Sequence, residues 1–237
     1  MKRFATLFAG LAVLALAATT ASAALRSPQI TVLGGGLQGY LNTADGGINA
    51  ASDQNAAQSW AATVSNNSTF TIQVELSGNA ASNALGLYNA GAASPSLYQV
   101  FPGAATTGWF AVASFRNSPT RVVVNLFDDT AALQGTTTYL GADRNNFGFY
   151  INGTAGTYYT QDSRNSGNAQ ALTYAGTGLN AGQWFLCFEE QIGGDQDYDD
   201  AILFLESDYD DAILFLESVN PTPVSKSSWG SLKARFR

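Results

Sequence analysis

The residues best suited to chemistry are carboxylates that gather near the C-terminus of the chain. Eleven of the 18 acidic residues lie between Glu189 and Glu217. Four of them follow the pattern D-x-D-x-D-D in one short segment, at Asp195, Asp197, Asp199 and Asp200. Alternate carboxylates in a tight loop can direct their oxygens toward one point, and such oxygen ligands are those that Ca²⁺ prefers. The spacing therefore predicts a cation site.

The segment that precedes this loop supplies further candidate ligands, Glu189 and Glu190. In a stretch this acidic, repulsion amounts to about 1 kcal/mol for each close pair of charges even in water. A divalent cation would relieve that repulsion, and its binding would appear as stability of the fold. We expect Ca²⁺ rather than Mg²⁺, because Mg²⁺ seldom accepts a cage made only of protein oxygens. The alternative is an ordinary acidic turn that keeps a sheet edge soluble.

The acidic loop opens a tandem repeat. Asp197–Ser207 and Asp208–Ser218 both read D-Y-D-D-A-I-L-F-L-E-S, so each copy joins an acidic turn to an apolar segment. One interpretation of the extra copy is a covered hairpin beside the first, and we favour it. A strand exchanged between molecules and a duplication without functional consequence are the alternatives.

Composition limits the class of protein. Residues 1–23 combine Lys2 and Arg3, an apolar run and A-S-A before Ala24, which predicts a signal peptide and an exported protein. Without those two cations the chain carries a net charge of about −9, which disfavours nucleic acid and anionic membranes as partners. The chain has no histidine, so Ser-His-Asp and Cys-His catalysis and histidine-type zinc sites are excluded. Cys187 is the only cysteine and is expected to be a small buried hydrophobic residue.

Short apolar or alternating segments separated by Gly, Asn, Ser and Asp predict an all-β fold, an antiparallel β-sandwich of the jelly-roll kind over residues 24–219. No segment of that region sustains a long helical period. The expected strands are Gln29–Leu33, Ser59–Val64, Thr69–Leu76, Leu85–Tyr88, Tyr98–Phe101, Trp109–Phe115, Arg121–Phe127, Phe147–Ile151, Thr157–Thr160, Ala169–Tyr174, Trp184–Glu189, Ala201–Leu205 and Ala212–Leu216.

Two further patterns concern organisation. Asn83–Tyr88 and Asn145–Tyr150 both fit N-x-Φ-G-Φ-Y, where Φ is apolar, and we interpret them as equivalent strands in two facing sheets. The central Gly of each would allow another chain to approach closely or mark a bulge. Residues 220–237 form a basic C-terminal tail, which is either a sorting or docking tag or a solvated end.

From Val74 onward the chain resembles the DUF4114 family of exported bacterial β-domains, which often occur in proteins with a PEP-CTERM sorting tail. The resemblance rests on E-L-S-G at Glu75–Gly78, N-A-L-G-L-Y at Asn83–Tyr88, Y-Q-V-F-P-G at Tyr98–Gly103, F-G-F-Y at Phe147–Tyr150, T-Y-Y-T at Thr157–Thr160, W-F-L-C-F-E-E at Trp184–Glu190 and G-G-D-Q-D-Y-D-D at Gly193–Asp200. It implies a secreted or surface β-sandwich that binds Ca²⁺ and has no established catalytic activity. It also adds Glu75 and Asn83 to the expected metal ligands.

The chain departs from the family pattern at three points. It has F-E-E where the family has F-E-D, and D-Y-D-D where the family has D-Y-N-D. Both changes keep oxygen ligands. No PEP-CTERM membrane span follows the last expected strand.

These observations favour a non-enzymatic structural or adhesion domain that is secreted or held at the cell surface and stabilised by calcium. One rival is a filament or surface-layer subunit that binds copies of itself by strand addition. Another is a carbohydrate-binding module for surface polysaccharide, with stacking faces from Trp60, Trp109, Tyr158 and Tyr159. A glycosidase is disfavoured, because the adjacent carboxylates of Asp128–Asp129 or Glu189–Glu190 would point to opposite faces of a strand.

Overall fold

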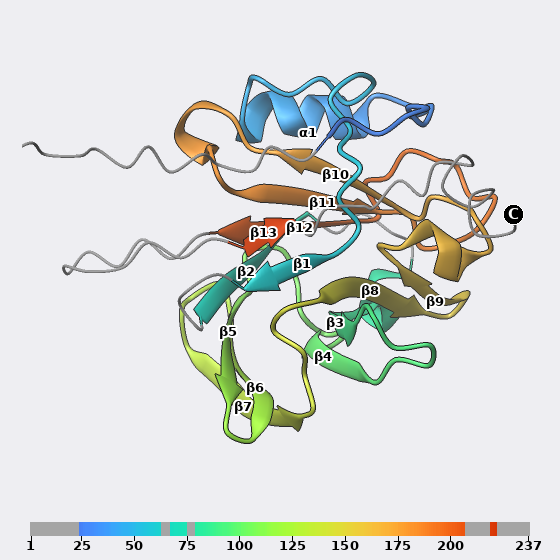
Figure 1. The fold of residues 1–237 in the computed structure, drawn as a ribbon. Coiled ribbons are helices and arrows are strands. Elements are labelled where there is room, and N and C mark those ends of the chain that lie inside the picture. The colour runs from blue at the N-terminus through green and yellow to red at the C-terminus, as the bar shows by residue number, and fades with distance from the viewer. Residues whose placement is uncertain (1–23, 63–66, 75–78, 207–218, 222–237) are drawn as a thin grey trace, which may run out of the picture.

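The chain folds mainly into strands, which form two antiparallel sheets (Figure 1). This computed structural model describes residues 24–62, 67–74, 79–206 and 219–221. The smaller sheet contains six strands, β13 (Val219–Pro221), β1 (Trp60–Ala62), β8 (Phe147–Gly153), β3 (Ala84–Asn89) and β4 (Leu97–Phe101) in this order, with β9 (Gly156–Tyr159) paired to β8. The all-β prediction is confirmed. The expected signal peptide lies outside the described residues.

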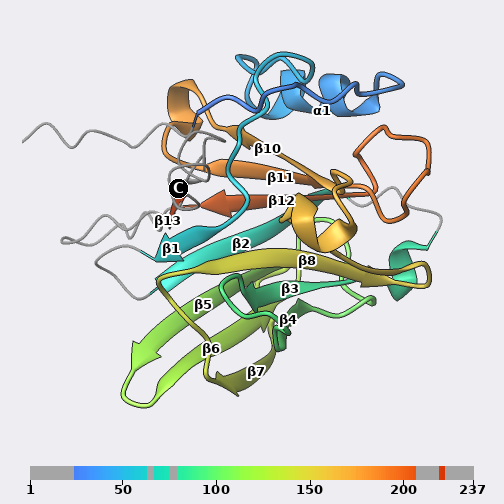
Figure 2. The same cartoon turned by 45° about the vertical axis from the view of Figure 1, so that its right-hand side comes forward.

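The larger sheet has seven strands, and Figure 2 shows them in sequence from the strand nearest the helix to the far edge. Their order is β10 (Ala171–Ala175), β11 (Trp184–Phe188), β12 (Ala201–Glu206), β2 (Asn67–Val74), β5 (Phe110–Asn117), β6 (Thr120–Phe127) and β7 (Leu133–Leu140). Three short 3-10 helices, Ala80–Ser82, Asp162–Asn165 and Gly178–Asn180, lie in connections.

Side chains of both sheets form one hydrophobic core. The ring of Phe70 from β2 meets the ring of Phe149 from β8 edge to face, with centroids 5.2 Å apart. Trp60 from β1 packs in the same way against Phe149 and against Trp184 from β11. Such aromatic pairs add to the free energy gained by burying their area. The more specific sandwich and jelly-roll assignment remains a prediction.

The position of β11 in the fold explains why its sequence, W-F-L-C-F, is apolar at every residue. Trp184, Leu186 and Phe188 belong to the core between the sheets. Phe185 and Cys187 point to the opposite face, where a second cluster covers them. A strand buried on both faces has no polar position, so it reads as a continuous apolar run.

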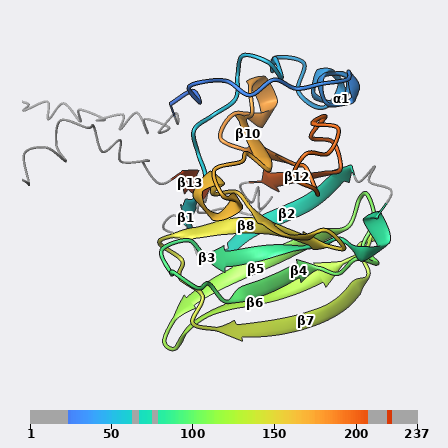
Figure 3. The ribbon, with the colours of Figure 1, turned by 90° about the vertical axis from the view of Figure 1, so that its right-hand side faces the viewer.

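The second cluster is closed by the one α-helix of the described residues, α1 (Gly36–Ala44), which lies at the same end of the fold as β10 (Figure 3). The cluster joins side chains of α1 to side chains of β10, β11 and β12. This helix was not predicted, because only Leu37 and Leu41 are buried along it and two of its nine residues are glycine. Two apolar residues one turn apart are too few to establish a helical period. The helix of the described residues is too short to cross a membrane.

The structure differs from the predicted strands at two places. No strand forms over Gln29–Leu33, because the side chain of Gln54 binds the backbone N–H and C=O of Ile30, both at 2.7 Å, in place of a neighbouring strand. Strand β7 was not expected. Its sequence, L-Q-G-T-T-T-Y-L, lacks apolar alternation because almost all of the strand is exposed at the sheet edge.

The two N-x-Φ-G-Φ-Y segments lie side by side in one sheet, not in two facing sheets. Strand β3 pairs with β8 so that Gly86 faces Tyr150 and Tyr88 faces Gly148. Each tyrosine ring covers the opposite glycine, since a Cβ at Gly86 would lie 2.8 Å from Tyr150 and one at Gly148 would lie 2.5 Å from Tyr88. At Gly148 the close approach is made by the Tyr88 ring. At Gly86 the backbone carbonyl of Tyr98 in β4 would lie nearest to an added Cβ, beside a register shift at Leu85–Gly86, so the expected approach of another chain and the expected bulge both occur there.

The first copy of the tandem repeat supplies β12, which lies between β11 and β2. Its Ile202 and Phe204 face the helix, whereas Leu203 and Leu205 face the core between the sheets. Both faces are thus covered, which accounts for the run A-I-L-F-L. The second copy, including the expected strand Ala212–Leu216, lies outside the described residues, as does most of the basic tail.

Candidate metal centre

The acidic loop joins the end of β11 to the start of β12, two neighbouring strands of the larger sheet. Gln196 and Tyr198 have φ values of 59° and 57°, so the backbone between the aspartates turns tightly instead of extending. Positive φ is uncommon in residues other than glycine and needs support from the surroundings. Tyr198 provides that support, because its side chain is buried and its hydroxyl donates a hydrogen bond of 3.0 Å to the Ala169 carbonyl.

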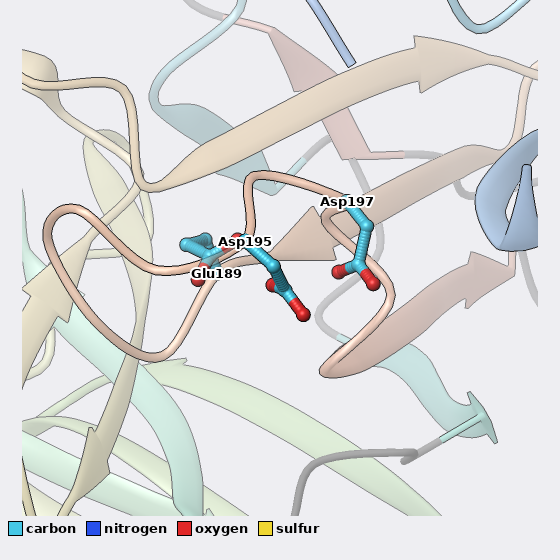
Figure 4. A group of neighbouring side chains, drawn as sticks. All are labelled: Glu189, Asp195 and Asp197. Atoms are coloured by element: carbon cyan, nitrogen blue, oxygen red, sulfur yellow. The ribbon is translucent and has the colours of Figure 1, made fainter. Parts of the chain in front are cut away.

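Three carboxylates converge at this loop. Each of Glu189, Asp195 and Asp197 offers an oxygen, and these oxygens lie within 4.8 Å of one another. Figure 4 shows Glu189 at the base of the loop, with the side chains of Asp195 and Asp197 projecting from the chain that returns over it. Glu189 is only 3% exposed, and its Oε2 has no hydrogen-bond partner. A buried carboxylate oxygen without a partner is energetically unfavourable unless a cation or proton satisfies it.

The electrostatics of the loop agree with this geometry. Burial, followed by the nearby charges of Asp200, Asp195 and Asp197, raises the pKa of Glu189 to about 7. Burial, followed by the charge of Asp197, raises the pKa of Asp199 to about 6. Burial also raises the pKa of Asp200 to about 6. No lysine or arginine occurs between residues 189 and 217, so the sequence places no cation in the loop itself.

Three of the expected ligands, Asp200, Glu190 and Asn83, have other partners. Asp200 accepts a hydrogen bond of 2.9 Å from the backbone N–H of Glu190. The carboxylate of Glu190 accepts bonds of 2.7 Å and 2.6 Å from the side-chain amides of Asn79 and Asn83. The structure therefore places these residues in a brace that holds the loop to the segment before β3. The Oδ1 of Asn83 is buried without a partner.

The remaining expected ligands are Asp199 and Glu75. Asp199 is buried, and its carboxylate lies against Gly36 at the start of α1, where an added Cβ would overlap it. The partial positive charge of a helix N-terminus favours an anion at this position. Glu75 lies outside the described residues.

Sequence reasoning missed the N-terminal segment that packs on the loop. The backbone N–H of Leu33 donates a hydrogen bond of 2.9 Å to the carbonyl of Gln196. Gly36 then lies against the Asp199 carboxylate, where no room remains for a side chain. Gly34, beside Asp197, has a φ of 69° that favours glycine. The run of three glycines at residues 34–36 was the one signal of such a close approach.

The structure also describes a candidate for sugar stacking, Trp60, and a carboxylate considered for glycosidase chemistry, Asp128. Trp60 is fully buried and offers no surface for a sugar, which corrects that expectation. Asp128 accepts hydrogen bonds from Thr130 and Ala132 in the turn between β6 and β7. Its carboxylate therefore stabilises a turn.

The geometry thus provides three oxygen ligands and a buried negative charge, a set that can hold a metal ion but does not identify which one. The family resemblance receives no independent support and remains a prediction. No protein-family model, curated protein or solved structure matches the chain.

Proposed function

We propose that this protein is an exported, non-enzymatic β-domain of the cell surface or extracellular matrix, and that calcium bound by Glu189, Asp195 and Asp197 stabilises it. The observation that carries the proposal is the buried Oε2 of Glu189, which lacks a partner and lies beside two further carboxylates. A cation at this point satisfies the oxygen and neutralises the charges together.

Calcium suits this loop better than magnesium. Ca²⁺ accepts six to eight oxygen ligands in flexible geometry, so three carboxylates can be completed by backbone carbonyls and water. Mg²⁺ requires near-ideal octahedral geometry and gives up its water reluctantly. Gln196 and Tyr198 have positive φ, so the loop turns tightly, and oxygens of its three carboxylates lie within 4.8 Å of one another.

The role of the ion is structural. The loop contacts β11, β12 and the segment that leads into α1. Fixing the loop therefore fixes the N-terminal segment that covers the outer face of the larger sheet. An ion that binds only the folded state stabilises it by about 2.7 kcal/mol when its concentration is one hundred times the dissociation constant.

The test is thermal unfolding of the purified exported protein in EDTA, in calcium and in magnesium. For a chain of this length, the expected gain corresponds to a rise of roughly 5–10 °C in calcium. The Asp195→Asn variant should lose most of this rise. Asp129→Asn is the matched control, because it removes the same charge from another exposed aspartate and should keep the full response.

Two results would contradict the proposal. One is a wild-type protein whose unfolding temperature is the same in EDTA and calcium. The other is an Asp195→Asn variant that responds to calcium as strongly as the Asp129→Asn control.

A second candidate function, binding of surface polysaccharide, is favoured by one cavity. This surface cavity of about 720 Å³ is lined by the polar groups of Ser94, Gln161, Ser163 and Arg164 and by the Tyr159 ring. Hydroxyls, an amide and an aromatic face are groups that sugars use for hydrogen bonding and stacking. A glycan array that binds the wild type but not Ser94→Tyr, which narrows the cavity, would support it. Absence of binding to any polysaccharide would exclude it.

A further inference from the structure

The outer edge of the seven-stranded sheet carries an inference beyond the proposed function. We propose that β7 pairs antiparallel with β7 of a second copy of this chain, so that two larger sheets join into one continuous sheet across a twofold axis.

Strand β7 has the properties of an open pairing edge. It is eight residues long, contains no charge and no proline, and seven of its eight residues are exposed. Leu133 and Leu140 at its two ends are 58% and 68% exposed, although large apolar side chains gain free energy by burial. Natural edge strands are usually protected by charge, proline, bulges or a covering segment, because their free N–H and C=O groups recruit other strands.

Other edges of the described sheets have such protection. At β10, the opposite edge of the same sheet, the backbone N–H of Asn55 donates a hydrogen bond of 2.7 Å to the carbonyl of Thr173. At β4, the carbonyl of Gln99 accepts a bond of 2.8 Å from the hydroxyl of Tyr139. Both strands are also shorter than β7, with five residues each.

The ladder between β6 and β7 defines which backbone groups of the edge are free for a partner. The N–H of Gly141 donates to the carbonyl of Thr120, so this pair is hydrogen-bonded. Hydrogen-bonded pairs alternate along an antiparallel ladder, so Thr137 bonds to β6 whereas Thr136 and Thr138 direct their N–H and C=O groups outward.

These outward groups are self-complementary. A twofold axis at Thr137 sets Thr136 opposite Thr138 of the second copy, and the two residues exchange both backbone hydrogen bonds. Threonine pairs directly opposite each other are among the favourable cross-strand pairs. The same register sets Gly135 opposite Tyr139 of the second copy, where a ring can cover a residue without a side chain.

The distribution of charge around β7 explains why its pairing partner is a second copy of this chain. Arg121 and Arg116, which face each other across β6 and β5, lie at the end of the sheet where Leu140 pairs with Arg121. Asp128 and Asp129 lie at the other end, directly after β6. Antiparallel pairing brings the basic end of one copy beside the acidic end of the other, twice, although the whole chain is acidic. Because β7 itself is uncharged and lies between a basic end and an acidic end, the edge of one copy is complementary to the same edge of another copy.

The experiment compares oligomeric state by sedimentation velocity over a wide range of protein concentration. The exported wild type should pass from monomer to dimer as concentration rises. The double variant Thr136→Lys and Thr138→Lys should remain monomeric, because the register sets lysines opposite each other. Thr154→Lys with Ala155→Lys is the matched control, since both positions are exposed in the turn between β8 and β9 and receive the same charge.

Mixing provides a readout that misfolding cannot mimic. The variant Thr136→Glu with Thr138→Glu should also be monomeric alone, whereas an equimolar mixture with the lysine variant should form a heterodimer. Hydrogen exchange then locates the contact. The amides of Thr136 and Thr138 should become protected at dimer concentrations, while that of Thr137 is protected in both states.

Three outcomes would overturn the proposal. They are a wild type that stays monomeric at every concentration, a dimer that survives the lysine variant, and charged variants that fail to pair when mixed. The calcium response has its own readout in the unfolding temperature, so either proposal can fail without the other.

Discussion

Replacing Glu189 by glutamine tests the electrostatic interpretation of the loop most directly. Its pKa rises from the ordinary 4.5 to about 7, mainly through burial. Between about pH 4.5 and pH 7 the folded protein keeps a proton on this residue that the unfolded chain has released. The stability of the calcium-free wild type should therefore fall as the pH rises through this window.

The size of the effect follows from the shift. Each pKa unit corresponds to about 1.4 kcal/mol, so a rise of this extent destabilises the calcium-free fold by about 3 kcal/mol above pH 7. Glutamine keeps the shape of the side chain and removes the charge. At pH 8 in EDTA, Glu189→Gln should thus unfold roughly 6–12 °C above the wild type. At pH 4 the difference should disappear, because the wild-type carboxyl is then protonated in both states.

The assay is thermal unfolding followed by circular dichroism across pH, with and without calcium. In calcium the order should reverse, since the wild type gains the ion and the variant lacks a ligand. Glu190→Gln is the matched control on the adjacent residue. It should lower stability at pH 8, because two asparagine amides lose a charged acceptor. A Glu189→Gln variant that is less stable than the wild type at pH 8 in EDTA would refute the reasoning.

Three further predictions concern the rest of the fold. Cys187 is fully buried and burial raises its thiol pKa, so a thiol reagent should label it only as fast as the protein unfolds, as measured by labelling rates in increasing denaturant. Asp162→Asn should lower the free energy of unfolding by about 3 kcal/mol in urea titrations, because it leaves the Arg26 guanidinium, 8% exposed and 2.9 Å from that carboxylate, without its charged partner. Deleting either copy of the repeat, Asp197–Ser207 or Asp208–Ser218, yields the same sequence. The shortened protein keeps one acidic loop and one A-I-L-F-L strand. It should therefore retain the wild-type calcium response in thermal unfolding.

The strands that sequence predicted best are those with apolar residues on one or both faces. Trp184–Glu189 and Ala201–Leu205 agree with β11 and β12 to within one residue, because burial on both sides removes every polar position. Strand β7 was missed for the opposite reason, since an exposed edge strand has no apolar face to mark it. The failed strand Gln29–Leu33 depended on Gln54, whose position no local pattern reveals.

The acidic loop was predictable in place but not in detail. The D-x-D spacing located Asp195 and Asp197, and Glu189 was expected to join them from the preceding strand. Alternation alone did not show that Asp200 binds the Glu190 backbone instead, because this depends on how the loop turns at Gln196 and Tyr198. The contact with the N-terminal segment joins residues about 160 positions apart, a separation beyond the range of local patterns.

The reciprocal covering of Gly86 by Tyr150 and of Gly148 by Tyr88 has a consequence for how this sequence can change over evolutionary time. A larger residue at either glycine collides with a ring, and a smaller residue at either tyrosine leaves a hole over bare backbone. Each single step is therefore unfavourable. Exchanging the large and the small partner preserves the volume at Gly148 and Tyr88, whereas at Gly86 the backbone of Tyr98 and Gln99 also excludes a side chain. Among descendants of this chain, Gly148 and Tyr88 should vary jointly or remain unchanged, and Gly86 should remain glycine.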